Sequence, residues 1–197
     1  VVLTGPTATT AMIYFGGLRG LGTLYWENRD GLEAAAAIYG APTLDDALRL
    51  VLAHRITHLV FFSWDDFGET YARLHRALPV GRSTPDVFAL RTGSILTLPT
   101  WTQALDYQIP PEFGLTGHDV LILEVRPEQT ADEHFSGMGA YCGNRGEMAN
   151  AVVCYRRSLE LRPDQPAALI GIAKALTRGG RAGEATAYLD RAAARSC

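Results

Sequence analysis

The sequence has few cysteines, one lysine and a small net charge, and each shortage excludes a class of protein. Its three cysteines are too few and too irregularly spaced for a disulfide framework or for a paired zinc site, so neither a metal nor another cofactor is expected. With 18 basic and 21 acidic residues, the formal charge is −3 and offers no long-range attraction for nucleic acid. Its one lysine, Lys174, is not in the glycine-containing Thr4–Thr10 segment, which excludes a Walker A phosphate-binding loop there.

The composition is that of a folded globular chain, and its apolar content shows no clear membrane span. Hydrophobic residues make up 47% and charged residues 20% of the 197 positions, enough for one domain and a smaller appended one. An uncharged stretch covers Val1–Leu18, but it contains threonines, three glycines and a proline, so we do not expect it to cross a membrane. The chain has no recognisable leader and is expected to be a piece of a longer protein.

The first part of the chain alternates patterns typical of strands and helices. Such alternation favours right-handed crossovers and a three-layer, Rossmann-like α/β domain with a mostly parallel sheet, which we place at residues 1–127. The strands are expected at Val1–Thr4, Gly22–Trp26, Ile56–Phe62 and Asp119–Val125. The helices are expected at Thr7–Phe15, Gly31–Tyr39 after an Asp30 cap, Thr43–Arg55, Phe67–Leu78 and Pro85–Leu96, with a long connection at Leu98–Gly117.

The last part of the chain repeats itself with a period of 34 residues. Ala151, Tyr155 and Ser158 are followed at this spacing by Ala185, Leu189 and Ala192, and Gly146 is followed by Gly180. Small residues alternate with large ones, and Pro163 follows the first unit. This pattern resembles the tetratricopeptide repeat, and the resemblance implies two helical hairpins over residues 132–197 that serve protein–protein interaction.

Two polar clusters follow expected strands and form a candidate ligand-binding rim. One consists of Trp26, Glu27 and Asn28, and the other of Trp64, Asp65 and Asp66. Open α/β sheets bind ligands at the carboxyl ends of their strands, where indoles can stack on sugar rings while carboxylates accept hydroxyl hydrogen bonds. Alternatively, Asp65 and Asp66 cap the next helix and the two tryptophans close the edge of the sheet.

No residue is placed for covalent chemistry or metal binding, so no catalytic residue is predicted. The segment Thr4–Thr10 joins a strand to a helix, where it either holds a phosphate or forms an ordinary capped turn. The five histidines lack ligand spacing, and no glycine-X-serine-X-glycine elbow occurs. Cys142 and Cys154 fall on adjacent helices of the first repeat and are expected to be buried thiols, although an oxidising compartment would allow a disulfide.

The repeats offer a second candidate site. Ala140, Asn144, Lys174 and Arg178 fall on first-helix positions that would line the concave side of a repeat pair. Asn144, Lys174 and Arg178 together could hold a peptide carboxylate or an acidic segment. The alternative is that these residues form an ordinary solvated face.

The first part also resembles a known family. The run from Gly20 to Asn28, the Gly31–Ala36 segment, the Ile56–Phe62 strand and Ile109-Pro110-Pro111 are similar to the soluble C-terminal domain of polytopic membrane glycosyltransferases of the oligosaccharyltransferase and protein-mannosyltransferase type. The run Trp64–Gly68 resembles the acceptor-reading motif of oligosaccharyltransferases, without its second tryptophan. Because the family's catalytic residues and metal lie on membrane-region loops, the resemblance implies a non-catalytic, extracytoplasmic domain.

The sequence therefore predicts a non-catalytic, periplasmic domain of a membrane-embedded glycosyltransferase-like protein, whose repeats bind a protein or peptide partner. Two alternatives remain. One is a soluble α/β enzyme domain that binds a nucleotide or sugar at Glu27, Asn28, Asp65 and Asp66, and the other is a pure tetratricopeptide scaffold. No nucleic-acid partner is expected.

Overall fold

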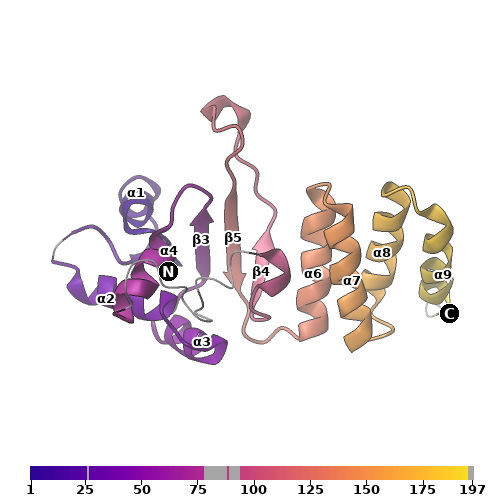
Figure 1. The fold of residues 1–197 in the computed structure, drawn as a ribbon, viewed down its shortest axis with the longest axis horizontal. Helices are drawn as coiled ribbons and strands as arrows, with labels where there is room; N and C mark the ends of the chain where they lie inside the picture. Colours follow the sequence, from indigo (N-terminus) through magenta and orange to yellow (C-terminus); the bar gives the residue numbers. More distant parts are fainter. Residues whose placement is uncertain (26, 78–87, 89–93, 195–197) are drawn as a thin grey trace. The chain divides into compact units, whose positions relative to one another are not determined.

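The computed structural model describes residues 1–25, 27–77, 88 and 94–194 and has a mixed α/β fold (Figure 1). The chain divides into two compact units. The first comprises Val1–Pro99 and Tyr107–Val125, and the second comprises Thr100–Asp106 and Arg126–Cys197. The segment Thr100–Asp106 thus belongs with the helical C-terminal part, although it precedes the last strand in sequence.

Four strands of the first unit lie side by side in the order β2-β1-β3-β5. Strand β1 (Val2–Leu3) runs parallel to β2 (Gly20–Leu21) on one side and to β3 (His58–Phe62) on the other. Helix α1 (Pro6–Gly16) begins with a proline, which suits the first turn, and ends before Gly17, whose φ of 62° lies in the left-handed region that glycine favours. The expected α/β class is confirmed.

The sheet is mixed, so the expectation of a mostly parallel sheet needs correction. Strand β5 (Val120–Val125) runs antiparallel to β3, with Phe62 opposite Val120 and His58 opposite Glu124. Leu59 and Leu123 are paired in this ladder and are fully buried. An apolar run such as residues 120–123 specifies burial but not direction, which is why the sequence pattern could not reveal the antiparallel pairing.

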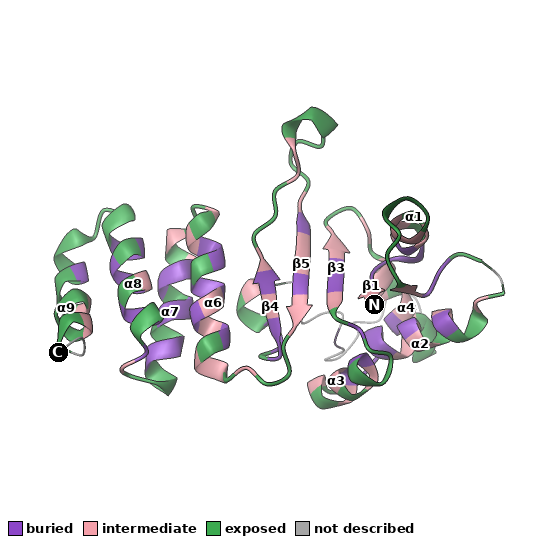
Figure 2. Cartoon of the chain, turned by 180° about the vertical axis from the view of Figure 1, so that it is seen from behind, coloured by how far each residue is buried: buried purple, intermediate pink, exposed green. Residues whose placement is uncertain are grey.

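Local signals placed most helices of the first unit well. Helix α3 (Leu44–Ala53) begins after Thr43, whose hydroxyl accepts a hydrogen bond from the Asp46 N–H at 3.1 Å. Helix α2 (Arg29–Tyr39) begins earlier than predicted, with Asn28 rather than Asp30 at the N-cap position. Helix α4 covers Phe67–His75. Buried residues on α2 and α3 include Ile38, Tyr39 and Val51, and Figure 2 shows such positions in purple.

Two strand predictions are wrong, and one helix prediction falls outside the described residues. The second strand is β2 at Gly20–Leu21, not Gly22–Trp26. It ends before Gly22, whose φ of 77° lies in the left-handed region and not in the extended region of a strand. The stretch Leu98–Gly117, expected to be a connection, contains strand β4 (Thr102–Leu105) and a 3₁₀ turn, η2 (Pro111–Phe113), and another 3₁₀ turn, η1 (Ile95–Thr97), precedes it. The helix expected at Pro85–Leu96 lies mostly in residues that the structure does not describe.

The second unit contains four consecutive helices. These are α6 (Ala131–Asn144), α7 (Met148–Leu161), α8 (Pro166–Arg178) and α9 (Ala182–Ala193). Each packs against the next, and α6 also contacts α8. The turns after α6 and α8 contain Gly146 and Gly180, both in the left-handed region with φ values of 80° and 77°. The faces that meet are buried, while the outward faces are exposed (Figure 2).

Candidate functional site

A pocket of about 370 Å³ lies within the second unit, among α6, α7 and α8. Its polar lining includes Asn144 from α6 together with Lys174 and Arg178 from α8, and its apolar lining includes Met148, Tyr155 and Ile170. The three residues predicted to bind a peptide therefore line one pocket. Asn144 and Arg178 are the last residues of their helices, and Lys174 lies one turn before Arg178 on the same face of α8.

Tyr155 fills the space between α6 and α8 and forms part of the pocket wall. Its ring lies so close to Gly139 of α6 and Gly171 of α8 that a Cβ atom at either glycine would overlap it. The side chain is buried, and this burial raises the pKa of its phenol, so the ring stays neutral at physiological pH. The two glycines and the tyrosine thereby fix the spacing of the three helices.

Apolar side chains at the pocket remain accessible to a ligand. Ile170 of α8 is 43% exposed, so part of its side chain can contact a ligand. Met148, at the start of α7, is half-buried and also lines the pocket. A flexible thioether beside an exposed isoleucine suits contact with an apolar side chain.

The cations of α8 are available for binding. Lys174 and Arg178 are both exposed, and neither forms an ion pair with any residue that the structure describes. Most other arginines of the helical unit are engaged, for example Arg157 with Glu160 at 2.8 Å and Arg181 with Glu184 at 2.7 Å. Two neighbouring cations of this kind can bind a carboxylate.

Asn144 has a partner within the unit. Its side-chain amide donates a hydrogen bond of 3.0 Å to the carboxylate of Asp106, which follows strand β4. Nothing in the sequence pointed to Asp106, because it lies 38 positions from Asn144 and outside the repeat. The pocket therefore has cations on its α8 side and a carboxylate beside its α6 side.

The predicted rim of the first unit is only partly assembled. Trp26 lies outside the described residues. Glu27 is exposed, and Asn28 donates a side-chain hydrogen bond of 2.8 Å to the Thr23 hydroxyl while it occupies the N-cap position of α2. Among the described residues, no hydrogen bond or ion pair joins Glu27 or Asn28 to Asp65 or Asp66. Convergence of the two clusters is therefore not seen.

Asp65 has a structural role at the carboxyl ends of β1 and β3. One of its oxygens accepts a 2.8 Å hydrogen bond from the Phe67 N–H at the start of α4, and the other lies where a Cβ atom of Gly5 would be. A carboxylate thus already lies beside the N-terminus of α1, where it opposes binding of a phosphate by the Thr4–Thr10 segment. Its charge adds to burial in raising the pKa of Tyr39.

The other rim residues of this region also have local partners or are exposed. Asp66 occupies the N-cap position of α4, without a hydrogen bond from its side chain to the helix. Trp64 is 48% exposed, and its ring contacts Phe62 and His118 at centroid distances of 4.9 and 5.1 Å. An indole that is half-exposed and held from two sides keeps a surface for stacking.

Cys142 of α6 and Cys154 of α7 are buried as free thiols and contact each other. The hydrogen bond between them and their burial raise the pKa of Cys142, which keeps this thiol protonated. They fill the space between α6 and α7, as expected for small apolar side chains.

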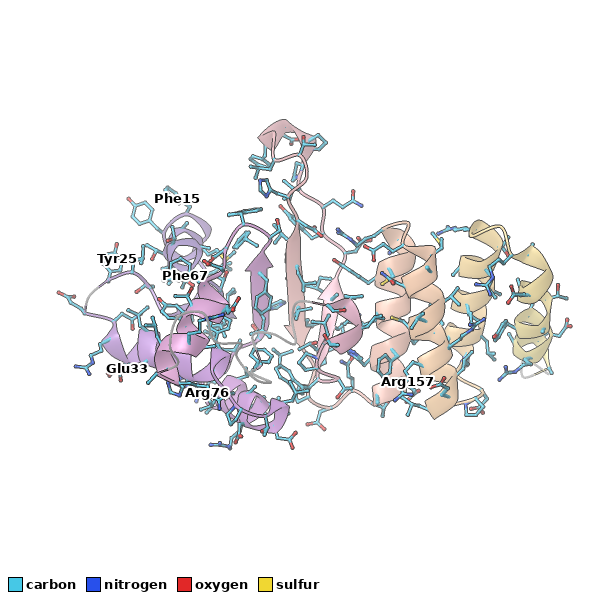
Figure 3. All side chains as sticks on the ribbon, viewed as in Figure 1. Phe15, Tyr25, Glu33, Phe67, Arg76 and Arg157 are labelled. Atoms are coloured by element: carbon cyan, nitrogen blue, oxygen red, sulfur yellow. The ribbon has the colours of Figure 1, made fainter. Side chains whose placement is uncertain are left out.

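An exposed apolar surface that the sequence analysis did not single out lies on and after α1. Tyr14, Phe15 and Tyr25 are 77%, 84% and 62% exposed, and Leu18 and Leu24 are also exposed. Phe15 and Tyr25 are labelled in Figure 3. The available signal was the absence of charge over Val1–Leu18.

Among the described residues, no helix has both the length and the apolar character that a membrane crossing requires.

Within the described parts of the chain, no three histidine, cysteine or acidic side chains gather in a way that would hold a metal ion. The helical pocket combines a carboxylate-binding pair, apolar contacts and an amide, which suits a peptide. Comparison with protein-family models, with curated proteins and with solved structures found no match to this chain.

Proposed function

We propose that this chain is a non-catalytic interaction module that binds a peptide segment of a partner protein in the pocket among α6, α7 and α8. The observation that carries this proposal is that Asn144, Lys174 and Arg178 line the same pocket as the accessible Met148 and Ile170. An acidic group of the peptide would pair with the two cations, while an apolar side chain would contact Met148 and Ile170.

We further propose that α6 to α9 form two tetratricopeptide hairpins. In support, two pairs of residues 34 positions apart have matching environments, although Tyr155 is buried and its counterpart Leu189 is exposed. Ala151 and Ala185 are both buried, and Gly146 and Gly180 have the same left-handed conformation in the turns between helices. Stacked hairpins of this kind place first-helix residues on a shared concave surface, which is where Asn144 and Arg178 would belong.

Charge reversal at the pocket tests the proposed binding function. The double variant K174E/R178E replaces both cations with acids, and we expect it to weaken binding of acidic peptides at least 100-fold, because two charge-assisted contacts are lost and repulsion is added. Binding of an array of fluorescein-labelled acidic peptides, followed by fluorescence anisotropy, measures the effect.

The matched control reverses the charges of two arginines of α7 that do not line the pocket. R156E/R157E changes the net charge by the same amount, and Arg157 is labelled in Figure 3. Circular dichroism checks that both variants remain folded. Equal loss of binding in the two double variants, or no acidic peptide bound by the unaltered chain, would contradict the proposal.

We propose a membrane glycosyltransferase-like parent with this chain on its extracytoplasmic side, on the basis of the resemblance of the first unit. The alternation of strands and helices underlies a further proposal, a three-layer, Rossmann-like arrangement for that unit. The reading frame upstream of Val1 tests the parent: several hydrophobic spans of about 20 residues each would support it, and a polar upstream sequence would remove it.

A second candidate is an α/β domain that binds a sugar or nucleotide at the ends of β1 and β3. The favouring observation is the half-exposed Trp64, which precedes Asp65, whose carboxylate lies against Gly5. Here the strand order changes direction, because β2 and β3 lie on opposite sides of β1. Isothermal titration with nucleotides and with mono- and disaccharides tests this candidate. Stoichiometric micromolar binding that W64A abolishes would favour it over a purely interaction-based role.

A further inference from the structure

The segment that ends at Asp106 is fixed along helix α6 by contacts of several kinds. The Gln129 side chain donates hydrogen bonds of 2.6 and 2.8 Å to the carbonyl oxygens of Thr100 and Thr102. A ring nitrogen of His134 lies 2.7 Å from the Thr102 carbonyl oxygen. These contacts fix β4 beside the first turn of α6, as Figure 1 shows.

The contacts continue towards the far end of the helix. The side chain of Gln103 occupies the space that a Cβ atom of Gly137 would need. Asp106 then meets Asn144, the last residue of α6, with 3.0 Å between the Asn144 amide nitrogen and an Asp106 carboxylate oxygen. The position of the Asp106 carboxylate is thus set by a segment anchored at both ends of α6.

The Asp106 carboxylate lies outside the pocket lining but is bound to Asn144, which belongs to that lining. Lys174 and Arg178 provide positive charge from α8, whereas Asp106 and the carbonyl end of α6 provide negative charge beside Asn144. Arg145, the next cation along the chain, pairs with Glu147 at 3.6 Å and lies over the Tyr141 ring. A ligand that extends from Lys174 and Arg178 past Asn144 therefore meets two cations and then the Asp106 carboxylate.

We propose that Asp106 is a specificity-determining residue that makes the pocket select peptides with charges of both signs. Such a peptide places its acidic side chain at Lys174 and Arg178 and its lysine or arginine at Asp106. A peptide with acidic groups at both places is rejected, because its second carboxylate is repelled by the like charge of Asp106. To bind Asn144 itself, that carboxylate would first have to displace Asp106. This inference rests on the proposed peptide-binding function.

The test compares two synthetic probes with the same apolar residues. One carries an aspartate and a lysine, and the other carries two aspartates at the same places. Fluorescence anisotropy at low salt gives the dissociation constant of each for the full chain. We expect the mixed-charge peptide to bind about tenfold more tightly, and we expect D106N to abolish this preference, mainly by tightening binding of the diacidic peptide.

D106N suits this test because asparagine keeps an oxygen that can accept the hydrogen bond from Asn144, so the variant removes charge with little structural change. The control D190N removes an exposed carboxylate from α9 and should leave the preference unchanged. If K174E/R178E abolishes binding of both probes but D106N leaves their ratio unaltered, Asp106 does not determine specificity, although the pocket still binds peptides. Absence of binding of either probe to the unaltered chain overturns both proposals.

Discussion

His134 shows how one side chain can make stability depend on pH. It is 1% exposed in α6, one ring nitrogen lies near the Thr102 carbonyl oxygen, and the other, Nε2, is buried without a hydrogen-bond partner among the described residues. Burial lowers the pKa of His134 below its ordinary value of 6.5, and the Thr102 contact only partly offsets this effect. The neutral ring is therefore the form that the folded unit accommodates.

We expect the free energy of unfolding to fall as the pH drops below about 6.5. The unfolded chain takes up a proton on this histidine at a higher pH than the folded chain does, so the stabilisation is complete above the ordinary pKa and is lost towards the lowered one. In H134Q this component of the pH dependence should disappear. Urea unfolding followed by circular dichroism from pH 5 to 8 measures it.

The control H54Q replaces an exposed histidine at the end of α3 and measures how far the loss of another histidine alters the pH dependence. If the free energy of unfolding changes with pH in the same way for the unaltered chain and H134Q, then His134 titrates alike in the folded and unfolded chains, and the prediction is wrong.

At the scale of helices, close packing depends on two glycines around one tyrosine. Gly139 and Gly171 leave room for the Tyr155 ring, so α6, α7 and α8 meet at a single point. The repeat pattern showed an alternation of small and large residues. It did not show that Gly139 and Gly171 face the same ring, because the two glycines have different places in the repeat.

We expect G171A and G183A to change stability in opposite directions. Both replacements add a residue with better helix propensity, but a Cβ atom at Gly171 overlaps the Tyr155 ring, whereas none of the surrounding atoms lies within 4 Å at Gly183. G171A should lower the free energy of unfolding by about 1–3 kcal/mol, and G183A should raise it by up to about 1 kcal/mol.

Urea unfolding, followed by the circular dichroism signal of the helices, gives the free energy of unfolding of each variant and distinguishes these outcomes. Stabilisation by both substitutions would show that the Tyr155 ring can move away without cost, and that the two glycines do not fix the spacing of the helices.

At the scale of the whole chain, the two compact units have separate buried cores. Leu59 belongs to the sheet of the first unit and Leu176 to α8 of the second, and each is fully buried. The unit boundary does not follow the sequence order, since Thr100–Asp106 belongs with the helices while Tyr107–Val125 belongs with the sheet.

We expect L59A and L176A each to destabilise their own unit by about 2–5 kcal/mol, through lost burial and the cavity that remains. Hydrogen exchange measured by mass spectrometry should show loss of protection in β3 and β5 for L59A, and in α6 to α8 for L176A. Equal loss of protection in both units for either variant would show instead that the chain unfolds as one cooperative body.

The sequence by itself determined what depends on neighbours along the chain. The Thr43 cap, the α/β class and the shared face of Asn144, Lys174 and Arg178 follow from local hydrogen bonding, burial patterns and a fixed repeat spacing. Only the tertiary structure decided what depends on distant partners. The antiparallel pairing of β5 with β3, the short β2, the position of Asp65 beside Gly5 and the Asp106 carboxylate at Asn144 each join segments that are remote in sequence. Neither periodicity nor propensity carries information on such contacts, because they depend on how the chain closes on itself.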